Sequence, residues 1–160
     1  KETPQHWIGL KYFNVYGPGE EQKQRMASII WQFMQQIKNG DNLKLFDASH
    51  GFDAGEQKRD FIYIEDVAKI TLYVFSNNIN SGIYNIGTGT AKSFNDLAMI
   101  FLNSNIANEI EYIPFPTDLL DHYQPFTCAE MDKLHSTGYN KKYISLNKGI
   151  ESYFNHSINK

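Results

Sequence analysis

Lysine supplies almost all of the positive charge of this chain, and only two side chains, Arg25 and Arg59, carry a guanidinium. A guanidinium holds a phosphate or a carboxylate through two parallel hydrogen bonds, which a lysine ammonium cannot form. Arg59 directly precedes Asp60. The two side chains therefore form either an exposed ion pair of little consequence or a site at which Arg59 binds an anionic ligand.

Three further features could take part in chemistry, and each has an ordinary structural alternative. Lys23 could act as a base, but the charged run 20–25 around it is typical of a solvated helix start. Tyr123 could stack on a nucleotide or could simply fill the core. The segment 85–89 could hold a phosphate or form a tight turn, since it lacks the third glycine of a dinucleotide-binding fingerprint.

Composition argues against several classes of partner and site. The net charge is -3, without the basic excess that nucleic-acid binding usually requires, so no nucleic-acid partner is expected. No apolar run approaches the roughly 18 residues of a membrane span, and the single Cys128 cannot form an internal disulfide. We therefore expect a cytoplasmic protein without membrane contact. No metal site is predicted, because the histidines share no ligand spacing: His6, His50, His122, His135 and His156.

Apolar periodicity alternates between strand and helix along the chain. The stripe from Met26 to Ile37, stopped by Asn39-Gly40, predicts an amphipathic helix. Ser93, with Asp96 three residues later, predicts the capped start of another helix. Strands are predicted at residues 7–13, 43–46, 59–64, 82–87 and 110–113, with loops at 14–19 and 47–58.

The remaining segments complete the alternating pattern. The loop 47–58 is polar and contains glycine, so it is expected to be exposed. A proline-bearing segment follows at 114–125, and short helices are expected around 129–135 and 145–155. A helix that opens at Glu65-Asp66 is expected to carry on one face Val67, Ile70, Thr71, Val74 and Phe75. The alternation predicts an α/β architecture with some parallel strands.

Three segments, in order, resemble motifs of the extended short-chain dehydrogenase/reductase family. Residues 11–18 resemble its Arg-x-x-Asn-x-Tyr-Gly-Pro segment, with Lys11 in the arginine position, and residues 59–68 and 84–89 resemble two later motifs. Further segments resemble the branch of that family that epimerises ADP-linked heptoses: Lys23 with Met26-Ala27-Ser28, Leu45-Phe46, residues 111–116 and residues 123–127.

The resemblance implies that residues 1–160 are the carboxy-terminal part of such a protein. They would hold the late strands of a Rossmann-type parallel sheet and a small α/β substrate-binding domain. The family's amino-terminal Gly-rich fingerprint and Tyr-x-x-x-Lys pair do not occur in these residues, so the amino-terminal dinucleotide-binding part is expected to be absent. NADP is the implied cofactor of the full-length protein, and its binding by this chain alone is not expected.

The resemblance also implies a role for individual residues. Lys23 is the implied catalytic base for one orientation of the sugar hydroxyl. Val15 and Lys23 are the implied cofactor contacts. The implied contacts of the substrate, ADP-heptose, are Asn14, Arg25, Gln32, Phe46, Asp47, Ala48, Ser49, Arg59 and Tyr123.

The activity that the resemblance implies is that of an isomerase in lipopolysaccharide core synthesis, with a homo-oligomer as the expected assembly. C6 of the heptose would be oxidised to a ketone and reduced again on the opposite face. Arg25 stands where serine is expected, Gln32 where histidine is expected, and the loop 50–57 is longer than usual, which bears on substrate preference. Two alternatives remain: another nucleotide-sugar epimerase or dehydratase, and a non-catalytic nucleotide-sugar-binding module.

Overall fold

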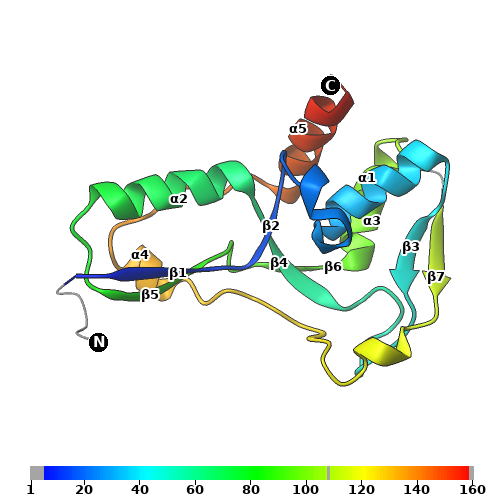
Figure 1. Cartoon of the computed structure of the whole chain (residues 1–160), viewed down its shortest axis with the longest axis horizontal. Coiled ribbons are helices and arrows are strands. Elements are labelled where there is room, and N and C mark those ends of the chain that lie inside the picture. Colours follow the sequence, from blue (N-terminus) through cyan, green and yellow to red (C-terminus); the bar gives the residue numbers. More distant parts are fainter. Residues whose placement is uncertain (1–5, 108, 159–160) are drawn as a thin grey trace.

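The computed structural model describes residues 6–107 and 109–158, apart from the side chains of Arg25 and Ile158 (Figure 1). Its strands are β1 (Ile8–Tyr12), β2 (Asn14–Tyr16), β3 (Leu43–Phe46), β4 (Lys58–Tyr63), β5 (Gly82–Ile86), β6 (Ala91–Ser93) and β7 (Ile110–Ile113). Its α-helices are α1 (Ile29–Asn39), α2 (Ile64–Ser76), α3 (Phe94–Asn103), α4 (Asp132–His135) and α5 (Leu146–Ile158). Its 3-10 turns are η1 (Glu21–Met26) and η2 (Thr117–Leu119).

Most strand pairs are parallel, which confirms the predicted α/β class. β1 pairs with β5, β2 with β4, and β3 with β7, all in parallel, and β6 adds an antiparallel neighbour to β4. Parallel neighbours need a crossover between them, and the helices supply it. In Figure 1, β1 and β5 lie under α2 at one end, α1, α3, β3 and β7 lie at the other, and β4 runs between them.

β4 separates two hydrophobic cores. Successive side chains of a strand point to opposite faces. Phe61 and Tyr63 pack into the core that also contains the buried residues of α1, α3 and α5. Ile62, between them, packs into the core formed with α2, β5 and α4. The strand that carries the predicted Arg59 is therefore fixed from both sides.

The two strongest helix predictions are confirmed. α1 buries Ile30, Phe33 and Met34, its Ser28 cap accepts a hydrogen bond from the Trp31 amide at 3.2 Å, and it ends at Gly40 in the left-handed region. At the start of α3, the Ser93 side chain accepts from the Asp96 amide at 3.0 Å, and the Asp96 carboxylate accepts from the Ser93 amide at 3.1 Å. This reciprocal pair is the predicted capping box.

Some predictions for the chain are wrong in detail. Asn14–Tyr16, predicted as part of a loop, forms the strand β2 because β4 offers it a parallel edge. β6 was not predicted, since three residues give too short a pattern. The helix expected around 129–135 begins only at Asp132.

Two predicted burial states are also wrong. Phe75, predicted on the buried face of α2, is 89% exposed. Gln57 lies in a loop predicted to be exposed, yet it is 1% exposed, and the next residue, Lys58, already belongs to β4. Within the described part of the chain, the helices are too short or too polar to cross a bilayer.

Candidate functional site

A cavity of about 300 Å³ lies where α1, β3 and β4 meet. This volume is at the lower end of the range for small-molecule sites. Four of the predicted substrate contacts line it: Gln32, Phe46, Arg59 and Tyr123. Lys44 also contributes to the lining, and no Asp or Glu does so among the described residues. The cavity therefore offers positive charge and amide groups, which suits an anionic ligand carrying hydroxyl groups.

Arg59 is the half-buried cation of this cavity. Its guanidinium carbon lies 4.9 Å from the centre of the Tyr123 ring and 5.7 Å from that of the Phe94 ring. Its Nη1 donates to the carbonyl of Lys58 at 2.9 Å. Burial lowers the pKa of Arg59, and Tyr123 opposes that effect. In residues 6–107 and 109–158, no carboxylate forms an ion pair with Arg59, so its positive charge has no counter-charge from those residues.

Tyr123 is held in a cluster of aromatic rings. Its ring centre lies 4.9 Å from Phe115 and 5.6 Å from His50, and Phe46 packs edge-on against Phe115 at 5.0 Å. The His50 Nε2 lies 2.8 Å from the carbonyl oxygen of Leu120, which ties the loop after β3 to the segment after β7. Burial raises the pKa of the Tyr123 hydroxyl, and Arg59 opposes the shift. The position of the ring that stacks on Arg59 is thus set by packing.

Buried Gln57 organises the loop that follows β3. Its Nε2 donates to the backbone carbonyl of Asp47 at 3.2 Å and to the Ser49 Oγ at 2.9 Å. Asp47 in turn accepts from the Ala48 amide at 2.7 Å. The predicted substrate contacts Asp47, Ala48 and Ser49 follow Phe46 in this loop. Phe46 and Gln57 line the cavity, but these three residues do not.

The remaining predicted residues lie on β2 and η1, outside the cavity lining. The Asn14 side-chain oxygen accepts a hydrogen bond from the Thr127 hydroxyl at 3.1 Å, and Val15 pairs with Ile62 across the sheet. The Lys23 Nζ lies 3.9 Å from Glu20 Oε1, and its side chain is 53% exposed. Arg25 belongs to η1, and its side chain lies outside the description.

The contacts of Asp60 bear on two questions that the sequence left open: whether Arg59 and Asp60 form an exposed ion pair, and whether residues 85–89 hold a phosphate or form a turn. Asp60 is fully buried, and its carboxylate accepts hydrogen bonds from the backbone amides of Thr88 (2.9 Å), Gly89 (2.9 Å) and Ala129 (3.0 Å). The interpretation of Arg59 and Asp60 as an exposed ion pair is therefore wrong. The segment 85–89 ends strand β5 and turns around this carboxylate, and the amides of Thr88 and Gly89 are occupied by it rather than free to hold a phosphate.

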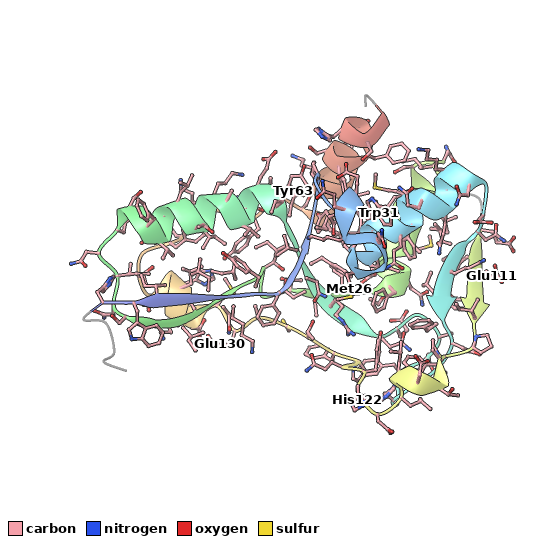
Figure 2. The ribbon with its side chains drawn as sticks, viewed as in Figure 1. Met26, Trp31, Tyr63, Glu111, His122 and Glu130 are labelled. Carbon is pink, nitrogen blue, oxygen red and sulfur yellow. The ribbon has the colours of Figure 1, made fainter. Side chains whose placement is uncertain are left out.

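Sequence reasoning missed several residues of the site. Phe94 packs against Arg59, but in the sequence it indicates only the start of a helix. His50 and Phe115 contact each other in loops, where no periodic pattern marks them. Gln57 lies in the polar run 47–58, where nothing in the sequence indicates that its side chain is buried. Among the described residues, no group of three or more His, Cys, Asp or Glu is arranged for a metal ion. His122, for example, lies at the outer tip of the segment after β7 (Figure 2).

Comparison with known proteins identifies the family. Residues 2–87, more than half of the chain, match the NAD dependent epimerase/dehydratase family. This chain belongs to that family. Over 161 aligned positions it is 44% identical to the ADP-L-glycero-D-manno-heptose-6-epimerase of Fusobacterium nucleatum, with 96% of this chain and 48% of the relative covered. The chain thus spans about half the length of this epimerase/dehydratase relative.

Solved structures of the epimerase/dehydratase family share the fold. The ADP-L-glycero-D-manno-heptose-6-epimerase of Helicobacter pylori superposes with a TM-score of 0.76 at 32% identity, covering 94% of this chain and 43% of that one. The UDP-glucose 4-epimerase of Thermus thermophilus, in complex with NAD, has a TM-score of 0.75 at 23% identity, covering 94% and 46%. The second likeness concerns the fold alone. The family resemblance inferred from the motifs is confirmed.

Membership of the epimerase/dehydratase family implies a nicotinamide dinucleotide. The sequence contains no Gly-x-Gly-x-x-Gly fingerprint, and the amides of Thr88 and Gly89 are already bonded to Asp60. The residues of this chain therefore do not fit the pyrophosphate of such a cofactor. They fit a separate anionic group at Arg59.

Proposed function

We propose that this chain is the substrate-binding part of a nucleotide-sugar epimerase that acts on an ADP-linked heptose. The observation that carries the proposal is the half-buried guanidinium of Arg59, which faces a cavity without a carboxylate partner among the described residues. A cation taken partly out of water requires compensation, and a diphosphate would supply it through charge-assisted hydrogen bonds. The heptose is suggested by the Fusobacterium nucleatum and Helicobacter pylori relatives.

The cavity wall provides groups of both kinds that a sugar diphosphate needs. Contacts with the rings of Tyr123 and Phe94 restrict the Arg59 side chain, so that less side-chain entropy is lost when it binds phosphate. The Gln32 amide donates to the Ala27 carbonyl, which leaves its oxygen as an acceptor for hydroxyl groups. The Gln36 oxygen accepts from the Lys44 amide, which leaves its NH₂ group as a donor.

Epimerisation requires a proton acceptor and donor for each orientation of the sugar hydroxyl. We assign one of these roles to Lys23, as the family motif implies. Hydride exchange is the chemistry that NADP, the proposed cofactor, supplies when it is bound by a dinucleotide-binding part outside this chain. Asn14 and Val15 on β2 complete the proposed substrate and cofactor contacts. The same proposal includes a cytoplasmic homo-oligomer that makes heptose precursors for lipopolysaccharide.

Ligand titration of the complete enzyme tests the substrate class. Calorimetry is expected to show tighter binding of ADP-mannose than of UDP-glucose. Arg59→Ala is expected to weaken ADP-mannose binding by roughly 10- to 100-fold, the usual worth of a hydrogen bond to a charged group. Lys133→Ala is a matched control, since it removes a cation stacked on Tyr84 in the other core. Preference for UDP-glucose would favour a different nucleotide-sugar enzyme of the family.

A non-catalytic nucleotide-sugar-binding module is the second candidate. It shares with the epimerase the cationic cavity at Arg59, which would bind the sugar diphosphate in either case. The two candidates differ in turnover: the epimerase converts the two C6 epimers of ADP-heptose into one another, whereas the module binds the nucleotide sugar and leaves it unchanged. Equal affinity of wild type and Arg59→Ala would contradict both.

A further inference from the structure

Glu20 is a buried carboxylate beside the candidate acid/base. It is 3% exposed, although the charged run to which it belongs had suggested a solvated position. Its oxygens accept hydrogen bonds from the Gly17 amide at 3.3 Å, the Ser28 amide at 2.8 Å and the Ser28 hydroxyl at 2.7 Å. Gly17 and Ser28 flank the η1 turn on its two sides. The Glu20 carboxylate therefore links the residues before and after the segment that carries Lys23.

The hydrogen bonds of Glu20 stabilise the η1 turn, whose own backbone is irregular. Gln24, next to Lys23, has φ 48° and ψ -124°, outside the helical region. A residue other than glycine with positive φ costs conformational energy, which the surrounding structure must offset. Glu20 also approaches Lys23 directly, with 3.9 Å between Oε1 and Nζ. The carboxylate is thus hydrogen-bonded to both flanks of the turn and forms an ion pair with the Lys23 ammonium group.

Glu20 connects this turn to the wall of the cavity. The Ser28 hydroxyl donates to Glu20 and accepts from the Trp31 amide, so the same group caps α1. The first turns of α1 supply Ile29 and Gln32 to the cavity lining. In Figure 2, Met26 at the end of η1 lies close to the start of α1, on which Trp31 is labelled.

The environment of Glu20 includes α5 as well. Burial raises the pKa of the Tyr153 hydroxyl, and the negative charges of Glu20 and Glu21 raise it further. Tyr153 is 1% exposed and belongs to the core beneath α1. The Glu20 carboxylate therefore lies where α1, α5 and η1 meet, a place with little freedom of movement.

We propose that Glu20 is a positioning residue, which holds Lys23 in a fixed relation to α1 and to the cavity. The proposal rests on the function proposed above, because it gives Lys23 a role in proton transfer. Proton-transfer groups act only from a narrow range of positions, and small displacements lower the rate strongly. Loss of the Glu20 charge is expected to free the Lys23 amine and to loosen the turn, while Arg59 and Tyr123, which are not among its hydrogen-bond or ion-pair partners, keep their positions.

The decisive experiment is a double-mutant cycle in the complete enzyme. Glu20→Gln is expected to lower kcat by about 10- to 100-fold, the cost of a misplaced catalytic group, while KM stays within about threefold. In the Lys23→Met background, Glu20→Gln is expected to lower kcat no further, because the group on which it acts is gone. Glu65→Gln, at a surface ion pair with Lys69, is the matched control and should leave kcat unchanged.

Two outcomes of this cycle would overturn the proposal. One is an unchanged kcat in Glu20→Gln, and the other is an equal fall in the wild-type and Lys23→Met backgrounds, which indicates a general loss of structure. If Glu20→Gln does not fold, Glu20→Asp retains the charge but withdraws it by one methylene group. Glu20→Asp is expected to lower kcat less than Glu20→Gln does, and to lower it no further in the Lys23→Met background.

A second measurement separates this inference from the proposed function. Acylation of individual lysines, followed by mass spectrometry, requires no enzymatic activity. Glu20→Gln should accelerate the acylation of Lys23 relative to Lys38 by about two- to fivefold, the worth of a partly exposed ion pair. An unchanged ratio would overturn the positioning role, even in an active enzyme. A protein without epimerase activity but with an altered ratio would refute the proposed function alone.

Discussion

Arg59 and Asp60 are adjacent in β4, yet their side chains serve opposite faces of the strand. The Arg59 guanidinium lies against Tyr123 at the cavity, whereas the Asp60 carboxylate binds the amides of the Thr88-Gly89 turn. Side chains alternate along a strand, so the two charges cannot form an ion pair and remain in these positions. One residue is thus available to a ligand, and the other stabilises the fold.

Asp60→Ala is expected to lower the free energy of unfolding by roughly 2–5 kcal/mol, because buried amide donors lose their acceptor. These donors belong to Thr88, Gly89 and Ala129. Urea denaturation followed by tryptophan fluorescence measures the change. Asp118→Ala, at an exposed carboxylate in η2, is the control and should change stability little. A loss below about 1 kcal/mol for Asp60→Ala would show that water satisfies the amides.

Lys23→Met in the complete enzyme is expected to lower turnover by roughly 10²- to 10⁴-fold, the usual contribution of one positioned proton-transfer group. Substrate affinity should change little, because Lys23 is outside the lining of the Arg59 cavity. Steady-state kinetics with the two C6 epimers of ADP-heptose measure both quantities. Lys38→Met, in the last turn of α1, provides a control for loss of a surface charge. Turnover within a few-fold of wild type would remove Lys23 from the mechanism.

Local patterns were sufficient to predict most elements of the fold. The α1 stripe, the Ser93 capping box and the strands at 43–46 and 82–87 depend on residues close in sequence. β2 was not predicted because a three-residue strand exists only through its pairing with β4. Phe75 follows the helical period of α2, but the pattern cannot show whether anything covers that end of the helix.

The candidate site was predictable only in part, for a related reason. Arg59 and Tyr123 were singled out by residue type and by the family motifs, and the structure brings them together. The buried carboxylates of Asp60 and Glu20 were not foreseen. Asp60 binds groups 28, 29 and 69 residues away along the chain, and Glu20 lies in a run whose composition is that of a surface. Contacts at such separations leave no periodic signal.

High pH is expected to destabilise the chain through Tyr143. Burial raises the pKa of this hydroxyl from 10.0 to about 12, with smaller effects from Tyr139, Asp60 and Asp66. Above pH 10 the unfolded chain loses the tyrosine proton before the folded chain does, so stability is lost as the pH rises from about 10 to about 12. Urea denaturation between pH 9 and 11 measures this slope, and Tyr143→Phe should make it shallower.

The comparison at pH 7 is the control for Tyr143→Phe. At pH 7 residue 143 is uncharged in both the wild type and Tyr143→Phe. Any difference in their free energies of unfolding at pH 7 therefore reports packing and the lost contact of the Tyr143 hydroxyl with His135 Nε2 at 3.2 Å. Only the difference in slope reports the proton. Identical slopes for the two proteins would mean that Tyr143 ionises alike in the folded and unfolded chains.

The final prediction concerns the apolar groove between β1 and α2. The groove has a volume of about 670 Å³, and its lining includes Trp7, Ile8 and Phe75. Phe75 is 89% exposed and Trp7 is 40% exposed. Among the described strands β1 pairs only with β5, so its other edge offers unpaired backbone groups. Exposed apolar surface beside a free strand edge favours association.

This chain on its own is therefore expected to self-associate at micromolar concentration, as measured by light scattering and sedimentation velocity. Phe75→Lys should shift the equilibrium toward the monomer, because a charge in the groove would have to be desolvated on association. Met99→Lys, at an exposed methionine on α3, is the matched control and should associate like the wild type. A wild-type chain that stays monomeric at all concentrations would show that neither the β1 edge nor the groove needs a covering partner.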